Sequence, residues 1–414
     1  MASQLSLPKD RIRILLLEGV HDSAVEALAA SGYASVTRHA GALEGEALQR
    51  ALDGVHVVGI RSRTQLTEAV IEGADKLIAI GCFCIGTNQV ALHAAASRGI
   101  PVFNAPFSNT RSVAELVMGE IVMLLRRIFP KSVAAHHGAW DKSAAESWEV
   151  RGKTLGIVGY GSIGSQLSVL AEAFGMRVIY FDTVNKLGHG NAIAVPTLAR
   201  LLAESDVVSL HVPQTPETDL LIGEAEIRAM KPGSFLLNNA RGNVVDLDAL
   251  ARALDDRHVL GAAIDVFPVE PGSNKEKFVS PLQGRDNVIL TPHIGGSTAE
   301  AQERIGVEVA AKLVEYSDVG ATLGAVNFPQ VQLPPRPRGT RFMHVHQNTP
   351  GILRRINEIF SEAQANIAAQ FLQTDGELGY VVVEAETRRD DDAAILARLR
   401  ALDGTIRARL LYQR

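Results

Sequence analysis

Residues 154–182 constrain the fold of this chain more than any other stretch. They read as an apolar strand, a glycine-rich turn, an amphipathic helix and a second apolar strand that ends at Asp182. The glycines of the turn, Gly159, Gly161 and Gly164, have the spacing G-x-G-x-x-G. Strand, tight turn and helix in this order are typical of the first βαβ unit of a nucleotide-binding sheet. The stretch therefore predicts a parallel α/β domain.

Each part of this unit has a physical role. Gly159 permits the turn, Gly161 lets the backbone approach a pyrophosphate, and Gly164 packs the helix against the strand. The helix N-terminus supplies N–H groups and positive potential, and a carboxylate at Asp182 can accept hydrogen bonds from a ribose diol. An ordinary glycine-rich turn is the alternative, but the flanking strands and the acidic end favour a dinucleotide site. The turn residues predicted to contact the dinucleotide are Gly159, Tyr160, Gly161, Ser162, Ile163 and Gly164.

Length and composition bound the possible functions. A chain of 414 residues should hold two or three domains, and a net charge of −5 gives no basic excess to suggest nucleic acid. The first ten residues lack the features of a signal peptide, and no apolar run approaches the length of a membrane span. We therefore expect a cytoplasmic protein. Cys82 and Cys84 are too close for a relaxed disulfide and too few for a closed metal site, so we expect reduced thiols and no metal.

A second α/β pattern precedes the glycine-rich stretch. Between residues 11 and 106, apolar strands alternate with helices, which predicts a separate parallel sheet. Arg61, Ser62 and Arg63 come directly after the strand predicted at 55–60. They should therefore lie at a carboxyl strand end, where ligands bind in open α/β sheets. A solvated loop is the alternative from spacing alone.

Three polar groups follow apolar strands beyond Asp182, namely Arg241, Glu270 and His293. Such a rim is expected for catalysis beside a bound dinucleotide. Hydride transfer between a 2-hydroxy acid and NAD needs a cation for the carboxylate, an acid/base for the hydroxyl proton, and a partner that orients the base. Arginine, histidine and glutamate supply these roles in that order. Taken singly, they also fit a surface ion pair, a core histidine and a turn carboxylate.

Prolines crowd residues 329–337 and mark a linker before a smaller C-terminal domain. Beyond it the apolar pattern predicts the order βαββαβ, which is ferredoxin-like. Pairing of its sheet edges between subunits would remove exposed edges. We predict a flavodoxin-like α/β substrate-binding domain at 1–108 and 298–332, a Rossmann dinucleotide-binding domain inserted at 109–297, and the C-terminal domain at 340–414.

Several motifs together resemble the D-isomer-specific 2-hydroxyacid dehydrogenase family. They lie at residues 159–164, 230–233, 239–242, 265–267 and 291–296. The match is closer still to those members that oxidise D-3-phosphoglycerate to 3-phosphohydroxypyruvate, the entry step to serine. The motifs that carry this closer match lie at 60–64, 84–88, 103–110 and 325–329. The C-terminal domain resembles an ACT domain, through residues 344–351 and 366–370.

The resemblance implies roles for individual residues, with Arg241, Glu270 and His293 catalytic. Besides the glycine-rich turn, it assigns to the cofactor NAD the residues Asp182, His211, Pro213, Ala240, Asp265, Gly295 and Gly296. It assigns to the substrate Arg61, Ser62, Arg63, Asn109 and Lys142, with a neighbouring subunit as one possible source of the lysine. It assigns to the feedback inhibitor L-serine the residues His346, Asn348 and Asn366, at interfaces between ACT domains of a homotetramer.

Two short stretches depart from the family pattern. Asn239 and Ala240 stand where the family usually has alanine and serine, which changes groups that line the cofactor. The glycine pair expected at the hinge before the ACT domain reads Arg338-Gly339, which leaves one permissive residue. Two alternative functions stay open: a related reductase of 2-oxoglutarate, hydroxypyruvate or glyoxylate, and a non-enzymatic NAD-sensing scaffold.

Overall fold

The chain divides into two compact units in the computed structural model. One unit comprises Met1–Ser108 together with Gln302–Arg414, and the other comprises Asn109–Ala301. The residues that the structure describes are 7–272, 275–334, 339–388 and 390–411. Arg338 of the predicted hinge lies outside these ranges. No helix within them is long and apolar enough to cross a membrane.

The unit Asn109–Ala301 contains a parallel sheet with the strand order β12-β11-β10-β9-β6-β7-β8. The order reverses between β6 and β9, which is the topological switch point of a Rossmann sheet. The central strands β6, β9 and β10 are buried along their whole length, because helices cover both faces of the sheet. The strands of the sheet are β6 (Thr154–Val158), β7 (Arg177–Phe181), β8 (Ile193–Ala194), β9 (Val207–Leu210), β10 (Ser234–Asn238), β11 (Val259–Ile264) and β12 (Val288–Leu290).

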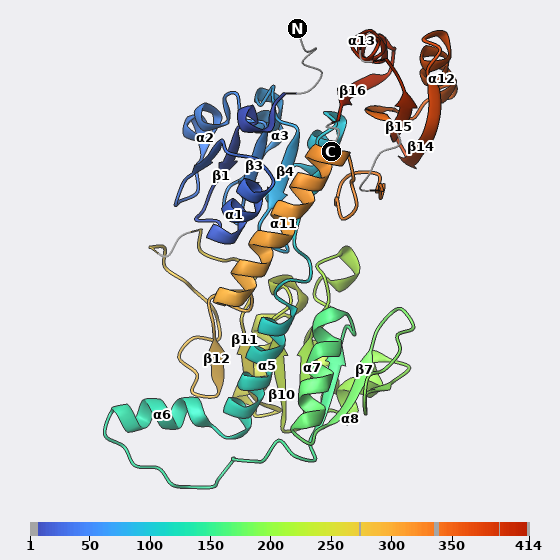
Figure 1. Cartoon of the computed structure of the whole chain (residues 1–414). Helices are drawn as coiled ribbons and strands as arrows, with labels where there is room; N and C mark the ends of the chain where they lie inside the picture. Colours follow the sequence, from blue (N-terminus) through green and yellow to red (C-terminus); the bar gives the residue numbers. More distant parts are fainter. Residues whose placement is uncertain (1–6, 273–274, 335–338, 389, 412–414) are drawn as a thin grey trace. The chain divides into compact units, whose positions relative to one another are not determined.

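Two apolar clusters hold helices on the faces of this sheet. Helices α5 (Thr110–Leu125) and α7 (Ser162–Ala173) lie side by side and bury Val117, Ile121 and Leu167 on one face (Figure 1). The second cluster gathers side chains from α8 (Leu198–Glu204), α9 (Glu224–Ala229) and α10 (Leu247–Asp255). The short 3₁₀ helices of this unit are η2 (Pro216–Thr218) and η3 (Gly242–Val244).

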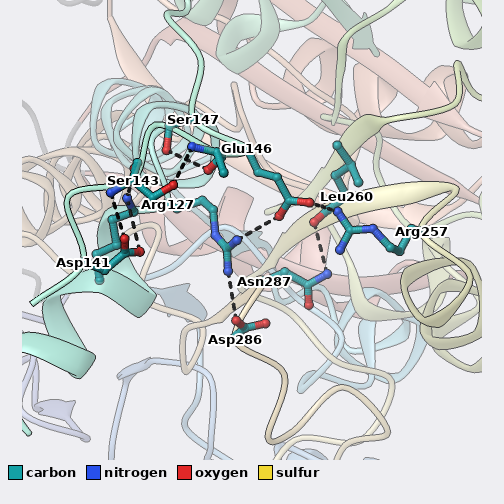
Figure 2. A network of polar contacts seen from close by, with 11 residues as sticks. Arg127, Asp141, Ser143, Glu146, Ser147, Arg257, Leu260, Asp286 and Asn287 are labelled. Atoms are coloured by element: carbon teal, nitrogen blue, oxygen red, sulfur yellow. Dashed lines mark hydrogen bonds and ion pairs between the residues drawn. The ribbon is translucent and has the colours of Figure 1, made fainter. Parts of the chain in front are cut away.

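Residues 127–146 form an arm that follows α5. This arm was not predicted from the sequence. It contains α6 (Ile128–His136), none of whose residues is buried. Figure 2 shows the polar network that pins both ends of the arm: Arg127 contacts Glu146 at 2.8 Å and Asp286 at 3.0 Å, and Arg257 also pairs with Glu146. Arg127 and Glu146 both have positive φ, so the chain turns sharply at each end.

The N-terminal part of the other unit contains a parallel sheet in the order β2-β1-β3-β4-β5, which is flavodoxin-like. Helices α1 and α11 contribute to an apolar cluster on one side, while α2, α3 and α4 contribute to another. The elements are η1 (Lys9–Arg11), β1 (Ile14–Leu16), α1 (Asp22–Ala30), β2 (Val36–Arg38), α2 (Gly45–Leu52), β3 (Val57–Ile60), α3 (Glu68–Gly73), β4 (Ala79–Cys82), α4 (Leu92–Ser97), β5 (Val102–Phe103) and α11 (Ala299–Val319).

The C-terminal part is antiparallel, with the strand order β14-β15-β13-β16. Side chains of α12 and α13 pack on one face of this sheet around Phe342, Val381 and Val383. The elements are β13 (Thr340–Gln347), α12 (Ile352–Glu362), β14 (Asn366–Asp375), β15 (Leu378–Glu386), α13 (Asp392–Ala401) and β16 (Thr405–Leu410). The order βαββαβ and the two parallel sheets confirm the predicted fold class.

Candidate active site

The glycine-rich turn joins β6 to α7 and leaves room for a ligand. Gly159 has φ +90°, and a Cβ there would lie 2.5 Å from the carbonyl oxygen of His211. A Cβ at Gly164 would lie 2.4 Å from the carbonyl oxygen of Gly159. Nothing lies within 4 Å of a Cβ placed on Gly161, which begins α7 without a side-chain cap. The second glycine therefore faces open space in front of uncapped helix N–H groups, as pyrophosphate binding requires.

Asp182 follows β7 and closes over the same turn. Its Oδ2 accepts a hydrogen bond from the N–H of Tyr160 at 2.9 Å, and its Oδ1 accepts one from the N–H of Val184 at 2.9 Å. A carboxylate has further lone pairs beyond these two bonds. The open backbone at Gly161 and the carboxylate beside it together fit a dinucleotide.

His211 follows β9, across the switch point from the turn. Its Nε2 lies 2.8 Å from Ser209 Oγ, while its Nδ1 is buried and has no hydrogen-bond partner among the described residues. Burial lowers the pKa of His211 to about 4, so the imidazole is neutral at pH 7. Pro213, two residues on, is exposed. The structure thus leaves one ring nitrogen of His211 without a hydrogen-bond partner among the described residues, and the contact of His211 with the cofactor stays a prediction.

His293 and Glu270 form an ion pair beyond the ends of β12 and β11. His293 Nδ1 lies 2.9 Å from Glu270 Oε2, and Glu270 Oε1 also accepts a hydrogen bond from the N–H of Phe267. The hydrogen bond to Glu270 raises the pKa of His293 despite partial burial. Burial acts to raise the pKa of Glu270, but the bond from His293 and nearby positive charges lower it overall. Since Nδ1 is occupied by Glu270, Nε2 of His293 is the ring nitrogen left for proton exchange.

Arg241 follows β10 and is half-buried. The side chain of Asn238 holds the turn that leads to Arg241. It accepts a hydrogen bond from the N–H of Ala240 at 3.1 Å and donates one to the carbonyl oxygen of Arg241 at 3.0 Å. Burial raises the pKa of Glu270, whereas the contacts of His293, the N–H of Phe267 and the positive charge of Arg241 lower it. Arginine, histidine and glutamate are therefore near one another at this rim.

Asp265 holds the loop that carries His293. Its Oδ1 accepts from Thr291 Oγ1 at 2.6 Å and from the N–H of Ile294 at 2.8 Å, and its Oδ2 accepts from the N–H of Gly295 at 2.9 Å. Burial raises the pKa of Asp265. The structure thus gives this carboxylate a loop-holding role, and its contact with the cofactor stays a prediction.

Glu120 was missed by sequence reasoning, although it lies behind the turn that carries Arg241. It is 1% exposed on α5, and its Oε2 accepts a hydrogen bond from Asn239 Nδ2 at 3.0 Å. Burial raises the pKa of Glu120 to about 8. Glu120 Oε1 and Asn239 Oδ1 are both buried without a hydrogen-bond partner among the described residues. A proton on Oε1 would satisfy both oxygens, so the neutral acid fits this pair.

The predicted substrate residues lie on three separate loops. Arg61, Ser62 and Arg63 follow β3 at the carboxyl end of its sheet, with Arg61 half-buried and the other two exposed. Asn109 is buried at the start of α5, and its amide lies close to Gly296. The remaining residue is Lys142, which is exposed on the arm after α6.

The predicted effector residues do not meet within one chain. His346 is buried on β13 with its Nδ1 3.1 Å from that of His344, and Asn348 is exposed just beyond the same strand. His346 pairs with Gly379 of β15, whereas Asn366 pairs with Glu386 of β15. Those two positions are seven residues apart on one strand (379 to 386), which is roughly 24 Å at about 3.4 Å per residue. A ligand of the size of an amino acid therefore cannot contact both ends of this sheet within one chain.

Comparison with known proteins identifies the class that this fold and rim define. Residues 118–295 match the family model described as D-isomer specific 2-hydroxyacid dehydrogenase, NAD binding domain, which supports NAD as the cofactor. Residues 342–407 match the AHAS small subunit-like ACT domain. The chain belongs to the D-isomer-specific 2-hydroxyacid dehydrogenase family, as its motifs predicted.

Within that family the chain is similar to D-3-phosphoglycerate dehydrogenases. It is 58% identical to that enzyme of Haemophilus influenzae over 412 residues, which cover 100% of both chains. It is also 58% identical to that of Escherichia coli K12 over 410 residues, with 99% of this chain and 100% of the relative covered. Among solved structures, D-lactate dehydrogenase from Aquifex aeolicus, complexed with NAD and lactic acid, matches with a TM-score of 0.64 and 29% identity. That match covers 73% of this chain and 95% of the other.

Proposed function

We propose that the chain is an NAD-dependent dehydrogenase that oxidises D-3-phosphoglycerate to 3-phosphohydroxypyruvate, the first step of L-serine biosynthesis. The observation that carries the chemistry is the ion pair of His293 and Glu270, beside Arg241 and on the sheet that bears the glycine-rich turn. The choice of D-3-phosphoglycerate as the substrate rests on the D-3-phosphoglycerate dehydrogenases that match over the full chain.

The residues divide the reaction into three tasks. Bound NAD supplies the acceptor for the hydride that leaves C2 of the substrate. Arg241 holds the carboxylate with its planar fork, which orients C2. His293 accepts the C2 hydroxyl proton at Nε2, and Glu270 stabilises the resulting imidazolium through Nδ1. In the reverse direction, the same imidazolium returns the proton to the carbonyl oxygen.

We infer that the far end of the substrate is bound by Arg61, Ser62 and Arg63, with Asn109 and Lys142 contributing to the site. Two guanidinium groups at a carboxyl strand end suit a phosphate, because each can donate paired N–H groups. They also suit a second carboxylate, so 2-oxoglutarate is the competing substrate that the chemistry allows. Hydroxypyruvate and glyoxylate carry no distal anion and leave these arginines unused.

A substrate panel tests this proposal. Initial rates of NADH oxidation should be measured with 3-phosphohydroxypyruvate, 2-oxoglutarate, hydroxypyruvate and glyoxylate. We expect the phosphorylated acid to give the highest kcat/KM, and the Arg63→Ala variant to lose most of that preference. A higher kcat/KM on 2-oxoglutarate than on 3-phosphohydroxypyruvate would identify 2-oxoglutarate as the substrate instead. No turnover with any of the four acids would favour a non-enzymatic NAD-binding scaffold.

We further propose that L-serine inhibits the enzyme between paired ACT domains of a cytoplasmic homotetramer. The support is geometric: His346 and Asn348 lie at one end of the sheet and Asn366 at the other, so a shared ligand needs a second copy. Asn348→Ala and Asn366→Ala should each weaken serine inhibition with unchanged substrate kinetics. Asn357→Ala, in α12 of the same domain, is the control. Serine inhibition that is competitive with the substrate would contradict this regulatory proposal.

A further inference from the structure

The loop that carries Arg61 and Arg63 is built around one carboxylate, that of Glu18. Glu18 Oε1 accepts hydrogen bonds from the N–H groups of Arg61 at 3.1 Å and Thr64 at 2.9 Å. Glu18 Oε2 accepts one from the N–H of Arg63 at 3.0 Å. Converging backbone N–H groups of this kind form an anion-binding concavity, and here the anion is a side chain of the protein itself. The loop backbone is thereby fixed from beneath, while Ser62 and Arg63 are exposed to solvent.

Glu18 is itself held in place. It follows β1, it is 9% exposed, and its N–H donates to the carbonyl oxygen of Gly41 at 3.1 Å. Its φ is +61°, which is uncommon for a residue other than glycine. Strained backbone conformations of this kind concentrate at functional sites. From the other side, Gln89 Nε2 donates to the carbonyl oxygen of Arg61 at 2.7 Å and to that of Gly86 at 3.1 Å. The backbone N–H and the backbone carbonyl oxygen of Arg61 are thus both hydrogen-bonded to buried side chains.

We propose that Glu18 is a positioning residue for the distal anion of the substrate, with Gln89 as its assistant. The inference rests on the proposed function, in which Arg61 and Arg63 bind that anion. Long arginine side chains lose less freedom on binding when their backbone is already fixed. A binding contribution that is equal in the ground state and the transition state changes KM and leaves kcat nearly constant.

Glutamine is the discriminating substitution at position 18. The amide keeps the size of the side chain but replaces one acceptor oxygen by an NH₂ group, which would face a backbone N–H donor. Glu18→Gln should therefore free the loop and raise KM for 3-phosphohydroxypyruvate on the order of ten-fold, with kcat within about two-fold. Gln89→Leu should give a smaller rise of the same kind. Glu46→Gln is the matched control, since Glu46 is an exposed carboxylate on α2 that pairs with Arg50.

The test compares these variants with 3-phosphohydroxypyruvate and with hydroxypyruvate, which has the same reacting end and no phosphate, both with NADH. KM for hydroxypyruvate should stay at the wild-type value in Glu18→Gln. An unchanged KM for the phosphorylated acid, or an equal loss on both substrates, would overturn the proposal. If Glu18→Gln does not fold, an unchanged KM in Gln89→Leu overturns it instead. A wild-type enzyme that does not turn over the phosphorylated acid refutes the proposed function, and this inference with it.

Discussion

Glu120→Gln should stabilise the protein, by an amount that grows with pH. The folded state raises the pKa of Glu120 from 4.5 to about 8, chiefly through burial, and Asn239 is its hydrogen-bond partner. Between those two values the unfolded chain releases a proton that the folded chain retains. Stability contributed by the neutral acid is therefore fully present below pH 4.5 and is lost as pH rises toward 8.

The magnitude follows from the shift. Each unit of pH inside this window lowers the free energy of unfolding by up to about 1.4 kcal/mol, so the loss between pH 4.5 and 7 is about 3 kcal/mol. Glutamine does not ionise, and its amide can make the same paired contact with Asn239. The variant should therefore match wild type near pH 4.5 and exceed its stability by about 3 kcal/mol at pH 7.

Urea unfolding of both proteins from pH 4.5 to 8 measures this difference. The transition that reports the unit Asn109–Ala301 is the one to compare, because a chain of several domains need not unfold in one step. Glu115→Gln, an exposed change on the same helix, is the control and should show no comparable pH dependence. The stability difference between Glu120→Gln and wild type should vary with pH. If it does not, Glu120 is not protonated in the folded protein.

The remaining predictions concern the rim and the cofactor. Arg241→Lys should lower kcat/KM by roughly 10- to 150-fold, since lysine cannot hold a carboxylate through two parallel bonds; wild-type efficiency would remove Arg241 from that role. Glu270→Gln should move the pH profile of oxidation toward lower pH, because the bond that raises the pKa of His293 is lost; a shift to higher pH would contradict the pairing. Asp182 should disfavour the 2′-phosphate of NADP by roughly 5- to 150-fold, about 1 to 3 kcal/mol, which parallel kinetics with NAD and NADP would check.

The fold was largely predictable because its signals are local. Strand, glycine turn and helix lie next to one another in sequence, so spacing alone placed β6, α7 and Asp182. The helix α6 of the arm was not predicted, because none of its residues is buried and it therefore has no apolar stripe that faces a core. The edge strand β2 and the helix α2 were also missed; β2 spans only Val36–Arg38, too short for an alternating pattern to be recognised.

The rim residues were predictable from strand ends, whereas their supports were not. Glu18 bonds residues 43 to 46 positions away, and Glu120 bonds Asn239 at a separation of 119. Such contacts depend on how strands from distant parts of the sequence pair, which no local pattern encodes. The sequence showed only that one glutamate, Glu18, follows a strand and that another, Glu120, lies inside an apolar helix. Neither could be assigned a role until the structure showed its hydrogen-bond partners. The separation of His346 from Asn366 likewise required the register of β15.

Turnover of D-3-phosphoglycerate with NAD, followed by NADH absorbance, tests the central claim most directly when wild type is compared with His293→Ala. Wild type should produce NADH, and the variant should be slower by about two to four orders of magnitude while it still binds NADH, because only the acid/base is lost. NADH binding can be followed separately by fluorescence titration. A wild type that forms no NADH, or a variant that turns over as fast as wild type, would contradict the account.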